Sequence, residues 1–82
     1  MPKRVRGQFA VCVDNSGYLA SLALHKIYRV LPDAAAEREG DLRVVDESGE
    51  DYLFDAERFL VVDPPEQTRR VLNRSFARAS TR

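Results

Sequence analysis

The sequence of 82 residues contains no tryptophan, one cysteine and one histidine, and each scarcity excludes a class of protein. A single cysteine, Cys12, cannot form an internal disulfide, so the chain is not a disulfide-stabilised secreted domain. Together with His25 it does not offer the several ligands that a zinc site needs. No apolar run approaches the ~20 residues of a membrane-spanning helix, and no secretory signal is visible. We therefore expect a cytoplasmic protein with no membrane segment.

Motifs of common enzyme classes are also missing, including G-x-x-x-x-G-K, G-x-S-x-G and H-E-x-x-H. Four carboxylates crowd one short stretch, and paired carboxylates can act as acid and base or bind a hard cation. Their spacing lacks the D-x-D-x-D-G pattern of calcium loops, and the hairpin tip on which we place them is open to water. The sequence predicts a non-enzymatic protein without metal or cofactor. We expect the four carboxylates to keep the chain soluble and to protect a sheet edge. They are Asp46, Glu47, Glu50 and Asp51.

The net charge of zero conceals a strong segregation of charge along the chain. Residues 33–66 carry a net charge of −9, whereas residues 1–6 carry +3 and residues 67–82 carry +5. One interpretation is a solvated acidic surface with two solvated basic ends. The other is that the basic ends contact an acidic partner or fold back on the acidic body of the chain. The acidic body and an isoelectric point near 6.6 disfavour nucleic acid, because phosphate binding needs a basic face. The arginines after residue 67 keep nucleic-acid binding as an alternative.

Residues 41–54 carry the clearest structural signal in the chain. Apolar residues recur with a period of two on both sides of Ser48 and Gly49, which is typical of β-strands. Gly49 supplies the positive φ angle that a tight turn requires. We predict a β-hairpin of strands 41–47 and 50–54 with one face in the core, made of Leu42, Val44, Tyr52 and Phe54.

The same reasoning predicts three further strands, at residues 8–13, 26–31 and 59–62. Residues 18–24 fit either a loop with a helical turn or a helix, and we prefer the loop. Asp33 is a good N-cap for a short helix over residues 34–39, and residues 55–58 suit one 3₁₀ turn. In strand 8–13 we place Ala10 and Cys12 on the reverse face. The remaining predicted core residues are Phe9, Val11, Val13, Tyr28, Val30, Phe59 and Val61.

Three stretches carry a resemblance to a known family: VDNSGY at residues 13–18, KIYRVLPD at residues 26–33 and DESGEDYL at residues 46–53. They resemble a family of small bacterial proteins of unknown function with an SH3-like β-barrel. The resemblance covers residues 8–63 and implies a mainly β fold, a small five-stranded SH3-like barrel, but no activity. The aromatic motifs of peptide-binding eukaryotic SH3 domains are absent, which disfavours recognition of proline-rich ligands. Around the barrel we expect a disordered basic lead-in at residues 1–7 and a C-terminal amphipathic helix and tail at residues 64–82.

The predicted sheet leaves large aliphatic residues on the face opposite the core, where a soluble antiparallel sheet is normally polar. If these residues lay together they would form a patch of several hundred Å², above what a monomer usually exposes. The C-terminal helix, predicted over residues 64–79, has an apolar stripe that can cover them, on its own barrel or on that of a second copy. Of these two arrangements we favour the homodimer. The predicted interface comprises Ile27, Leu31, Leu53, Leu60, Val71, Leu72 and Phe76.

The function predicted from the sequence is a small protein-interaction or regulatory module whose protein partner is not identified. The alternatives are a nucleic-acid-binding barrel that uses its arginine-rich helix and an oligomerising structural protein.

Overall fold

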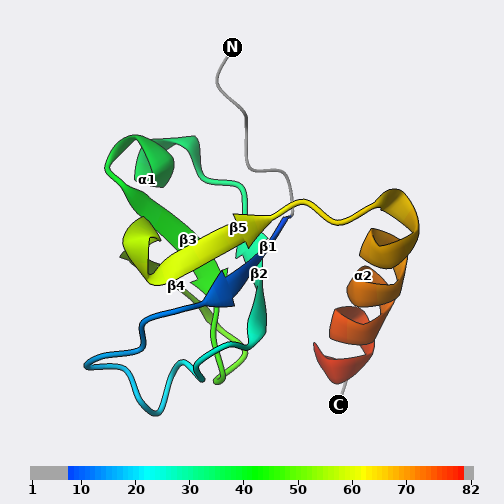
Figure 1. Cartoon of the computed structure of the whole chain (residues 1–82), viewed down its shortest axis with the longest axis horizontal. Helices are drawn as coiled ribbons and strands as arrows, with labels where there is room; N and C mark the ends of the chain where they lie inside the picture. The colour runs from blue at the N-terminus through cyan, green and yellow to red at the C-terminus, as the bar shows by residue number, and fades with distance from the viewer. Residues whose placement is uncertain (1–7, 81–82) are drawn as a thin grey trace.

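The structure, a computed structural model, describes residues 8–80, so the lead-in predicted at residues 1–7 lies outside the described residues. Five antiparallel strands form one open sheet in the order β4-β3-β2-β1-β5 (Figure 1). Each strand lies within two residues of its predicted range, and the prediction of a mainly β fold with a C-terminal helix is confirmed. The strands are β1 (Phe9–Cys12), β2 (Ile27–Leu31), β3 (Asp41–Val45), β4 (Asp51–Asp55) and β5 (Phe59–Val62).

The predicted hairpin forms between β3 and β4. Val44 faces Tyr52 and Leu42 faces Phe54, as the alternation predicted. Gly49 has φ +87°, which a residue with a Cβ rarely adopts, and its N–H donates to the Asp46 carbonyl at 3.0 Å. The turn therefore sets the register that places one face of the hairpin in the core.

The sheet bends around one core, so that its two edge strands approach each other. Phe54 of β4 and Phe59 of β5 are both buried, and their ring centroids lie 6.1 Å apart. The 3₁₀ helix η1 (Ala56–Arg58) makes the connection between the two strands. The core comprises Ala10, Cys12, Leu22, Tyr28, Val30, Leu42, Val44, Phe54 and Phe59.

The predicted orientation of β1 is wrong. Ala10 and Cys12 face the core, while Phe9 is buried on the opposite face of the sheet. Alternation divides a strand into two sets of side chains, but it does not say which set faces inward when both are apolar. Here the large rings of other strands fill the core, and the small Ala10 and Cys12 fit against them. Val13 lies beyond β1 and is exposed.

Two other predicted core residues are also exposed. Tyr52 is 49% exposed and Val61 is 45% exposed, although Phe54 and Phe59, two positions along the same strands, are buried. Both belong to edge strands, which have a neighbouring strand on one side only. The alternation identifies their face correctly but cannot reveal that the sheet ends there.

The long connection between β1 and β2 contributes a core residue that we did not predict, Leu22, which is fully buried. The carbonyl of Tyr18 accepts the N–H groups of Ser21 and Leu22 at 3.0 and 2.9 Å. The amide Nδ2 of Asn15 donates to the Leu22 carbonyl at 3.0 Å. Residues 18–24 are thus a loop with a helical turn, as preferred, and Leu22 anchors that loop to the core.

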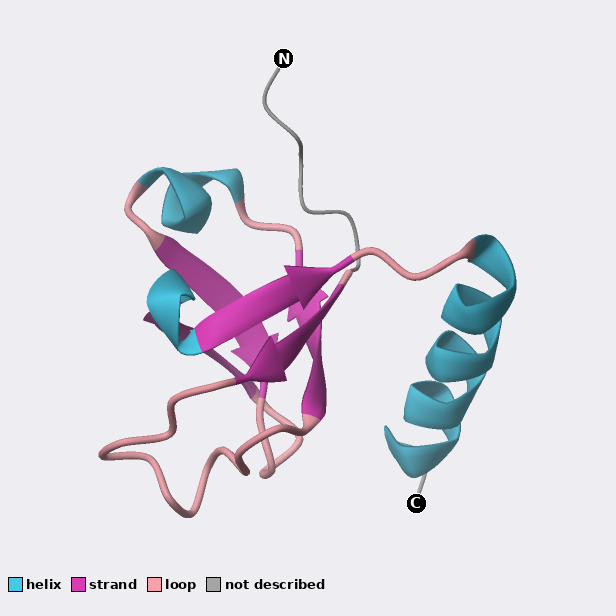
Figure 2. Cartoon of the chain, viewed as in Figure 1, coloured by secondary structure: helices cyan, strands magenta, loops and turns pink. Residues whose placement is uncertain are grey.

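Two α-helices lie outside the sheet (Figure 2). In α1 (Ala34–Arg38) the Asp33 carboxylate accepts the Ala36 N–H at 3.0 Å, which confirms the predicted N-cap. The C-terminal helix α2 (Glu66–Ser80) follows Pro64 and Pro65 and lies beside the sheet. None of the helices in the described part of the chain is long and apolar enough to cross a membrane.

Candidate functional site

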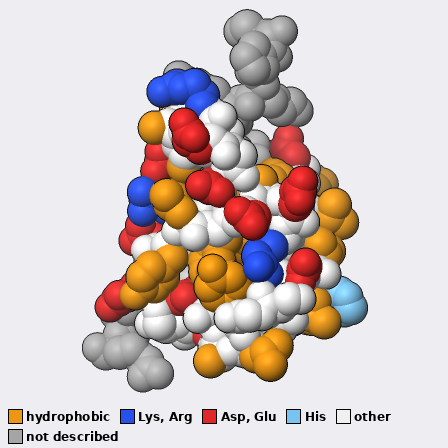
Figure 3. Space-filling view, turned by 90° about the vertical axis from the view of Figure 1, so that its left-hand side faces the viewer, with side chains coloured by type: hydrophobic (Ala, Val, Ile, Leu, Met, Phe, Trp, Pro, Cys, Tyr) orange, Lys and Arg blue, Asp and Glu red, His pale blue; other side chains and the backbone are white. Residues whose placement is uncertain are grey.

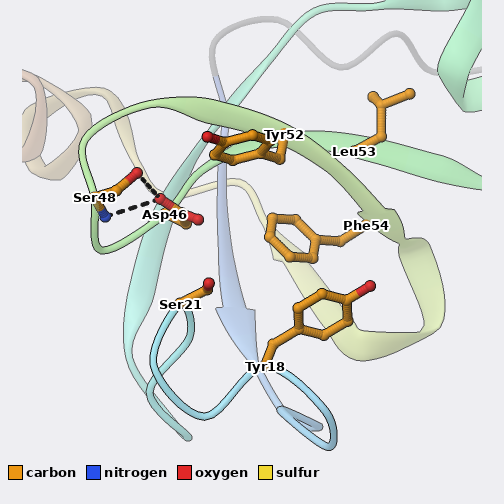
Figure 4. A pocket seen from close by; sticks show the side chains of 7 residues that line it. All are labelled: Tyr18, Ser21, Asp46, Ser48, Tyr52, Leu53 and Phe54. Atoms are coloured by element: carbon orange, nitrogen blue, oxygen red, sulfur yellow. Dashed lines mark hydrogen bonds between the residues drawn. The ribbon is translucent and has the colours of Figure 1, made fainter.

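A groove of about 420 Å³ opens between the β1–β2 loop and the β3–β4 hairpin (Figure 4). We call it the aromatic groove. The loop contributes a tyrosine and a serine, the hairpin turn an aspartate and a serine, and β4 the remaining side chains. The lining residues are Tyr18, Ser21, Asp46, Ser48, Tyr52, Leu53 and Phe54.

Three aromatic rings form the apolar part of the groove. Phe54 is only 4% exposed, whereas Tyr18 and Tyr52 are 41% and 49% exposed. The rings of Tyr18 and Phe54 meet edge to face, with centroids 5.1 Å apart, which is a favourable aromatic geometry. In Figure 4 the Leu53 side chain points away from these rings, so it belongs to the rim. A buried ring therefore lies between two half-exposed rings that a ligand can reach.

Arg58 holds the Tyr18 wall in place. Its guanidinium carbon lies 4.8 Å from the centroid of the Tyr18 ring, a cation–π contact. Its Nη1 donates to the Ser16 carbonyl at 2.8 Å and the Asp14 carbonyl at 3.2 Å, which ties the tip of the loop to η1. Tyr18 is thus fixed from behind although half of its surface faces water.

Asp46 forms the polar end of the groove. One carboxylate oxygen accepts the Ser48 N–H at 2.8 Å and the Ser48 hydroxyl at 2.6 Å, which caps the hairpin turn. The other oxygen points away from Ser48, toward the side of the groove where Phe54 lies (Figure 4). Asp46 is only 7% exposed, so our placement of this carboxylate at a water-exposed tip is wrong. The turn folds back over Asp46 and buries it.

A hydrogen-bond network joins the two sides of the groove. The Glu47 carboxylate accepts the Lys26 ammonium at 2.7 Å and also accepts the Tyr28 hydroxyl. The Tyr28 hydroxyl in turn accepts the Ala23 N–H at 2.7 Å, and the Ser21 carbonyl accepts the Glu47 N–H at 3.0 Å. Loop and hairpin are therefore held at a defined separation.

The network shifts the pKa values of Glu47 and Tyr28. The hydrogen bonds from Lys26 and then Tyr28 hold the pKa of Glu47 below its usual range, since both favour the carboxylate. Burial, followed by the hydrogen bond to Glu47, raises the pKa of Tyr28 to about 12. The network is therefore intact with Glu47 ionised and Tyr28 neutral, the forms that prevail near neutral pH.

The surroundings of the groove are acidic. The Tyr52 hydroxyl donates to the Glu50 carboxylate at 3.0 Å, and this bond is the main reason that the pKa of Tyr52 is raised. Figure 3 shows that Asp and Glu side chains gather on the face of the molecule turned away from α2. None of the residues that line the groove carries a positive charge.

The predicted interface residues of the sheet fall into two separate groups. Ile27 and Leu60 pair with Val11 from either side, so the three side chains form one row across β2, β1 and β5. Ile27 is 37% and Leu60 61% exposed. Leu31 and Leu53 instead pair from either side with Arg43 of β3, in the other half of the sheet. The bend of the sheet separates residues that the sequence analysis combined in one patch.

The predicted interface residues of α2 also lie on two different faces of the helix. Phe76 is half-buried and stacks on Phe9, while Leu72 is half-buried on the same side of the helix. Val71 is 54% exposed and lies on another face. The helix thus contacts the sheet of its own chain through Phe76, and Leu72 lies on the same side of the helix.

Among residues 8–80, no group of three or more His, Cys, Asp or Glu side chains is arranged to hold a metal ion. Cys12 is buried in the core, and His25 is exposed with φ +66°. The backbone N–H of His25 donates to the Cys12 carbonyl at 2.7 Å, which joins the end of the β1–β2 loop to the end of β1.

The aromatic groove itself was not predicted. The sequence analysis assigned Tyr52 and Phe54 to the core and left Tyr18 in an ambiguous stretch, and no local pattern connects Tyr18 to β4. Comparison with known proteins finds no family model, no curated protein and no solved structure that matches this chain. The function proposed for the groove therefore rests on the contacts and burial of its own residues.

Proposed function

We propose that this protein is a small non-enzymatic interaction module that binds a segment of a partner protein in the aromatic groove. One observation carries the proposal: Tyr18 and Tyr52 are half-exposed, yet each is held by specific contacts above the buried Phe54. Tyrosine is enriched at protein interfaces because it offers a large apolar surface together with a polar group. A wall that is already ordered also loses little conformational entropy when a ligand binds.

The arrangement of the strands supports an SH3-like barrel as the scaffold of this module. Five short antiparallel strands bend around one core, and the contact between Phe54 and Phe59 brings the edge strands together. The long β1–β2 loop and the hairpin turn then lie side by side at one end. In such a scaffold the loops carry recognition while the sheet keeps their positions.

A binding role agrees better than catalysis with the polar groups of the groove. The Ser48 hydroxyl donates to Asp46, whose same oxygen also accepts the Ser48 N–H. This is the geometry of a turn cap, in which the hydroxyl stabilises the backbone instead of attacking a substrate.

The test is to select peptides from a displayed random library on the full chain and to measure their affinities for matched variants. Tyr18→Ala and Tyr52→Ala should weaken the selected peptides by about tenfold or more, about 1.4 kcal/mol of binding free energy. The control is Leu19→Ala, because Leu19 follows Tyr18 in the same loop, is 77% exposed and does not line the groove. If the selected peptides bind both tyrosine variants as tightly as the control, the groove is not the binding site.

A second candidate, homodimerisation, rests on the row of Ile27, Val11 and Leu60, in which Ile27 and Leu60 are exposed and Val11 is half-buried. These residues are adjacent in three neighbouring strands, and α2 leaves Leu60 61% exposed. An exposed apolar row on a small sheet is a common subunit contact. Sedimentation should then detect a dimer that Leu60→Glu dissociates, and a monomer at every accessible concentration would reject this candidate.

A further inference from the structure

We infer that the aromatic groove receives a cationic side chain, lysine or arginine, of the bound segment. The inference rests on the proposed function and adds the chemistry of the ligand. It combines two independent features: three aromatic rings around one opening, and a nearly buried carboxylate with one oxygen directed into it.

The rings of Tyr18, Tyr52 and Phe54 suit a cation because the face of an aromatic ring carries negative electrostatic potential. Two other contacts in this chain show the same preference. The Arg58 guanidinium lies over the Tyr18 ring at 4.8 Å, and the Lys26 ammonium lies over the Tyr28 ring at 5.4 Å.

Arg58 does not fill the groove or dominate its charge. It occupies one face of Tyr18 from outside, bonded to the Ser16 carbonyl and 3.7 Å from the Asp14 carboxylate. The hydrogen bonds from Ser16 hold the pKa of Asp14 below its usual range, so this carboxylate is charged and offsets the guanidinium.

Asp46 supplies the charge complementarity. One of its oxygens is bonded twice to Ser48, and the second points away from Ser48 toward the rings. The Glu50 carboxylate lies next to the groove through its bond to Tyr52. An anionic ligand would be repelled by both carboxylates. A purely apolar ligand would take water from Asp46 and return no hydrogen bond, which is unfavourable for a carboxylate.

The size of the groove is compatible with this ligand. Its volume of about 420 Å³ lies within the range of pockets that hold small organic groups. A long aliphatic stem could lie along Tyr52 and Phe54 while its charged end meets Asp46. Both lysine and arginine have such a stem, and a short acidic or hydroxyl side chain does not.

The experiment uses the full chain, labelled with ¹⁵N, and three defined probes: the N-acetyl methylamides of lysine, arginine and norleucine. Norleucine matches the lysine stem but lacks the ammonium group. We expect the lysine and arginine probes to shift the amide signals of Tyr18, Asp46 and Tyr52, with affinities about tenfold above that of norleucine.

Two variants test the two halves of the site. Asp46→Asn keeps an oxygen that can cap Ser48 but removes the charge, and it should abolish the preference over norleucine. Tyr52→Leu keeps an apolar wall at a half-exposed position, so it preserves the fold even if the Asp46 variant does not, and it should weaken the cationic probes about tenfold. The charge-matched control is Glu39→Gln, an exposed residue at the end of α1, which should change nothing.

The outcomes separate the inference from the proposed function. If norleucine binds as well as lysine and arginine, or if neither variant alters the preference, the inference is wrong while the groove remains a binding site. If no probe shifts a groove signal and no selected peptide depends on Tyr18 or Tyr52, both are wrong.

Discussion

The ring of Phe9 in β1 stacks on the ring of Phe76 in α2, with centroids 5.7 Å apart and planes inclined by 22°. Phe9 is fully buried although it lies on the sheet face opposite the core, because α2 covers it. The contact explains why β1 can be apolar on both faces. It also holds α2 against the sheet, in addition to the ion pair between Arg69 of α2 and Asp63, which follows β5.

Phe76→Ala should therefore reduce the free energy of unfolding by about 1–3 kcal/mol, less than for a fully buried ring because Phe76 is half-exposed. Urea denaturation followed by circular dichroism measures the change. The control is Arg74→Ala on an exposed face of the same helix, which should change the stability by less than about 0.5 kcal/mol. Equal stability of the two variants would show that α2 does not depend on the Phe9 contact.

Phe54→Ala should be the more damaging core substitution, with a loss of about 3–5 kcal/mol, because the ring is almost fully buried. It contacts both Tyr18 and Phe59, so it supports the groove and the approach of the edge strands. The neighbouring Leu53 is 45% exposed, and Leu53→Ala is the matched control with a much smaller loss. Similar losses for the two variants would contradict the assigned faces of β4.

The link between Glu47 and its two donors predicts a loss of stability in acid. The pKa of Glu47 is lower in the folded chain than in the unfolded chain, where it is about 4.3. The stabilisation is therefore present above the unfolded value and is lost as the pH falls through the folded value. Urea midpoints measured downward from neutral pH should fall less steeply for Glu47→Gln than for the unchanged protein. Parallel curves would mean that Glu47 does not connect the loop to the hairpin.

The same network predicts the opposite behaviour in alkali. The pKa of Tyr28 is raised to about 12, so its contribution is present below the usual tyrosine value and is lost as the pH rises through the folded value. Ultraviolet absorption of tyrosinate should show a late ionisation near pH 12 that Tyr28→Phe removes. A variant that retains this late step would assign it to another tyrosine.

The arginines of α2 are the feature of this chain that most favours nucleic-acid binding. Arg70, Arg74 and Arg78 recur every four residues and so share one exposed face of the helix, where Arg70 also lies 3.6 Å from Glu66. We nevertheless predict no useful affinity for duplex DNA at physiological salt, because residues 33–66 carry a net charge of −9. Fluorescence anisotropy with a labelled duplex tests this. Micromolar binding that Arg70→Glu and Arg74→Glu abolish would overturn the prediction.

The sequence by itself determined the elements whose causes are local. The alternation on both sides of Gly49 defines the β3–β4 hairpin, and Asp33 defines the start of α1, because turn geometry and helix capping involve residues only a few positions apart. The two prolines and the apolar stripe of residues 71–76 likewise predicted a C-terminal helix, which begins two residues later than expected.

Only the tertiary structure decided which face of β1 is internal and where a site forms. Both faces of β1 are apolar, so the choice depended on the rings from distant strands and on Phe76, 67 positions after Phe9. The aromatic groove depends on a loop residue, Tyr18, that meets Phe54 across the sheet. Contacts between residues so far apart in the chain leave no periodic trace in the sequence, because they arise from the bend of the sheet and not from the local backbone.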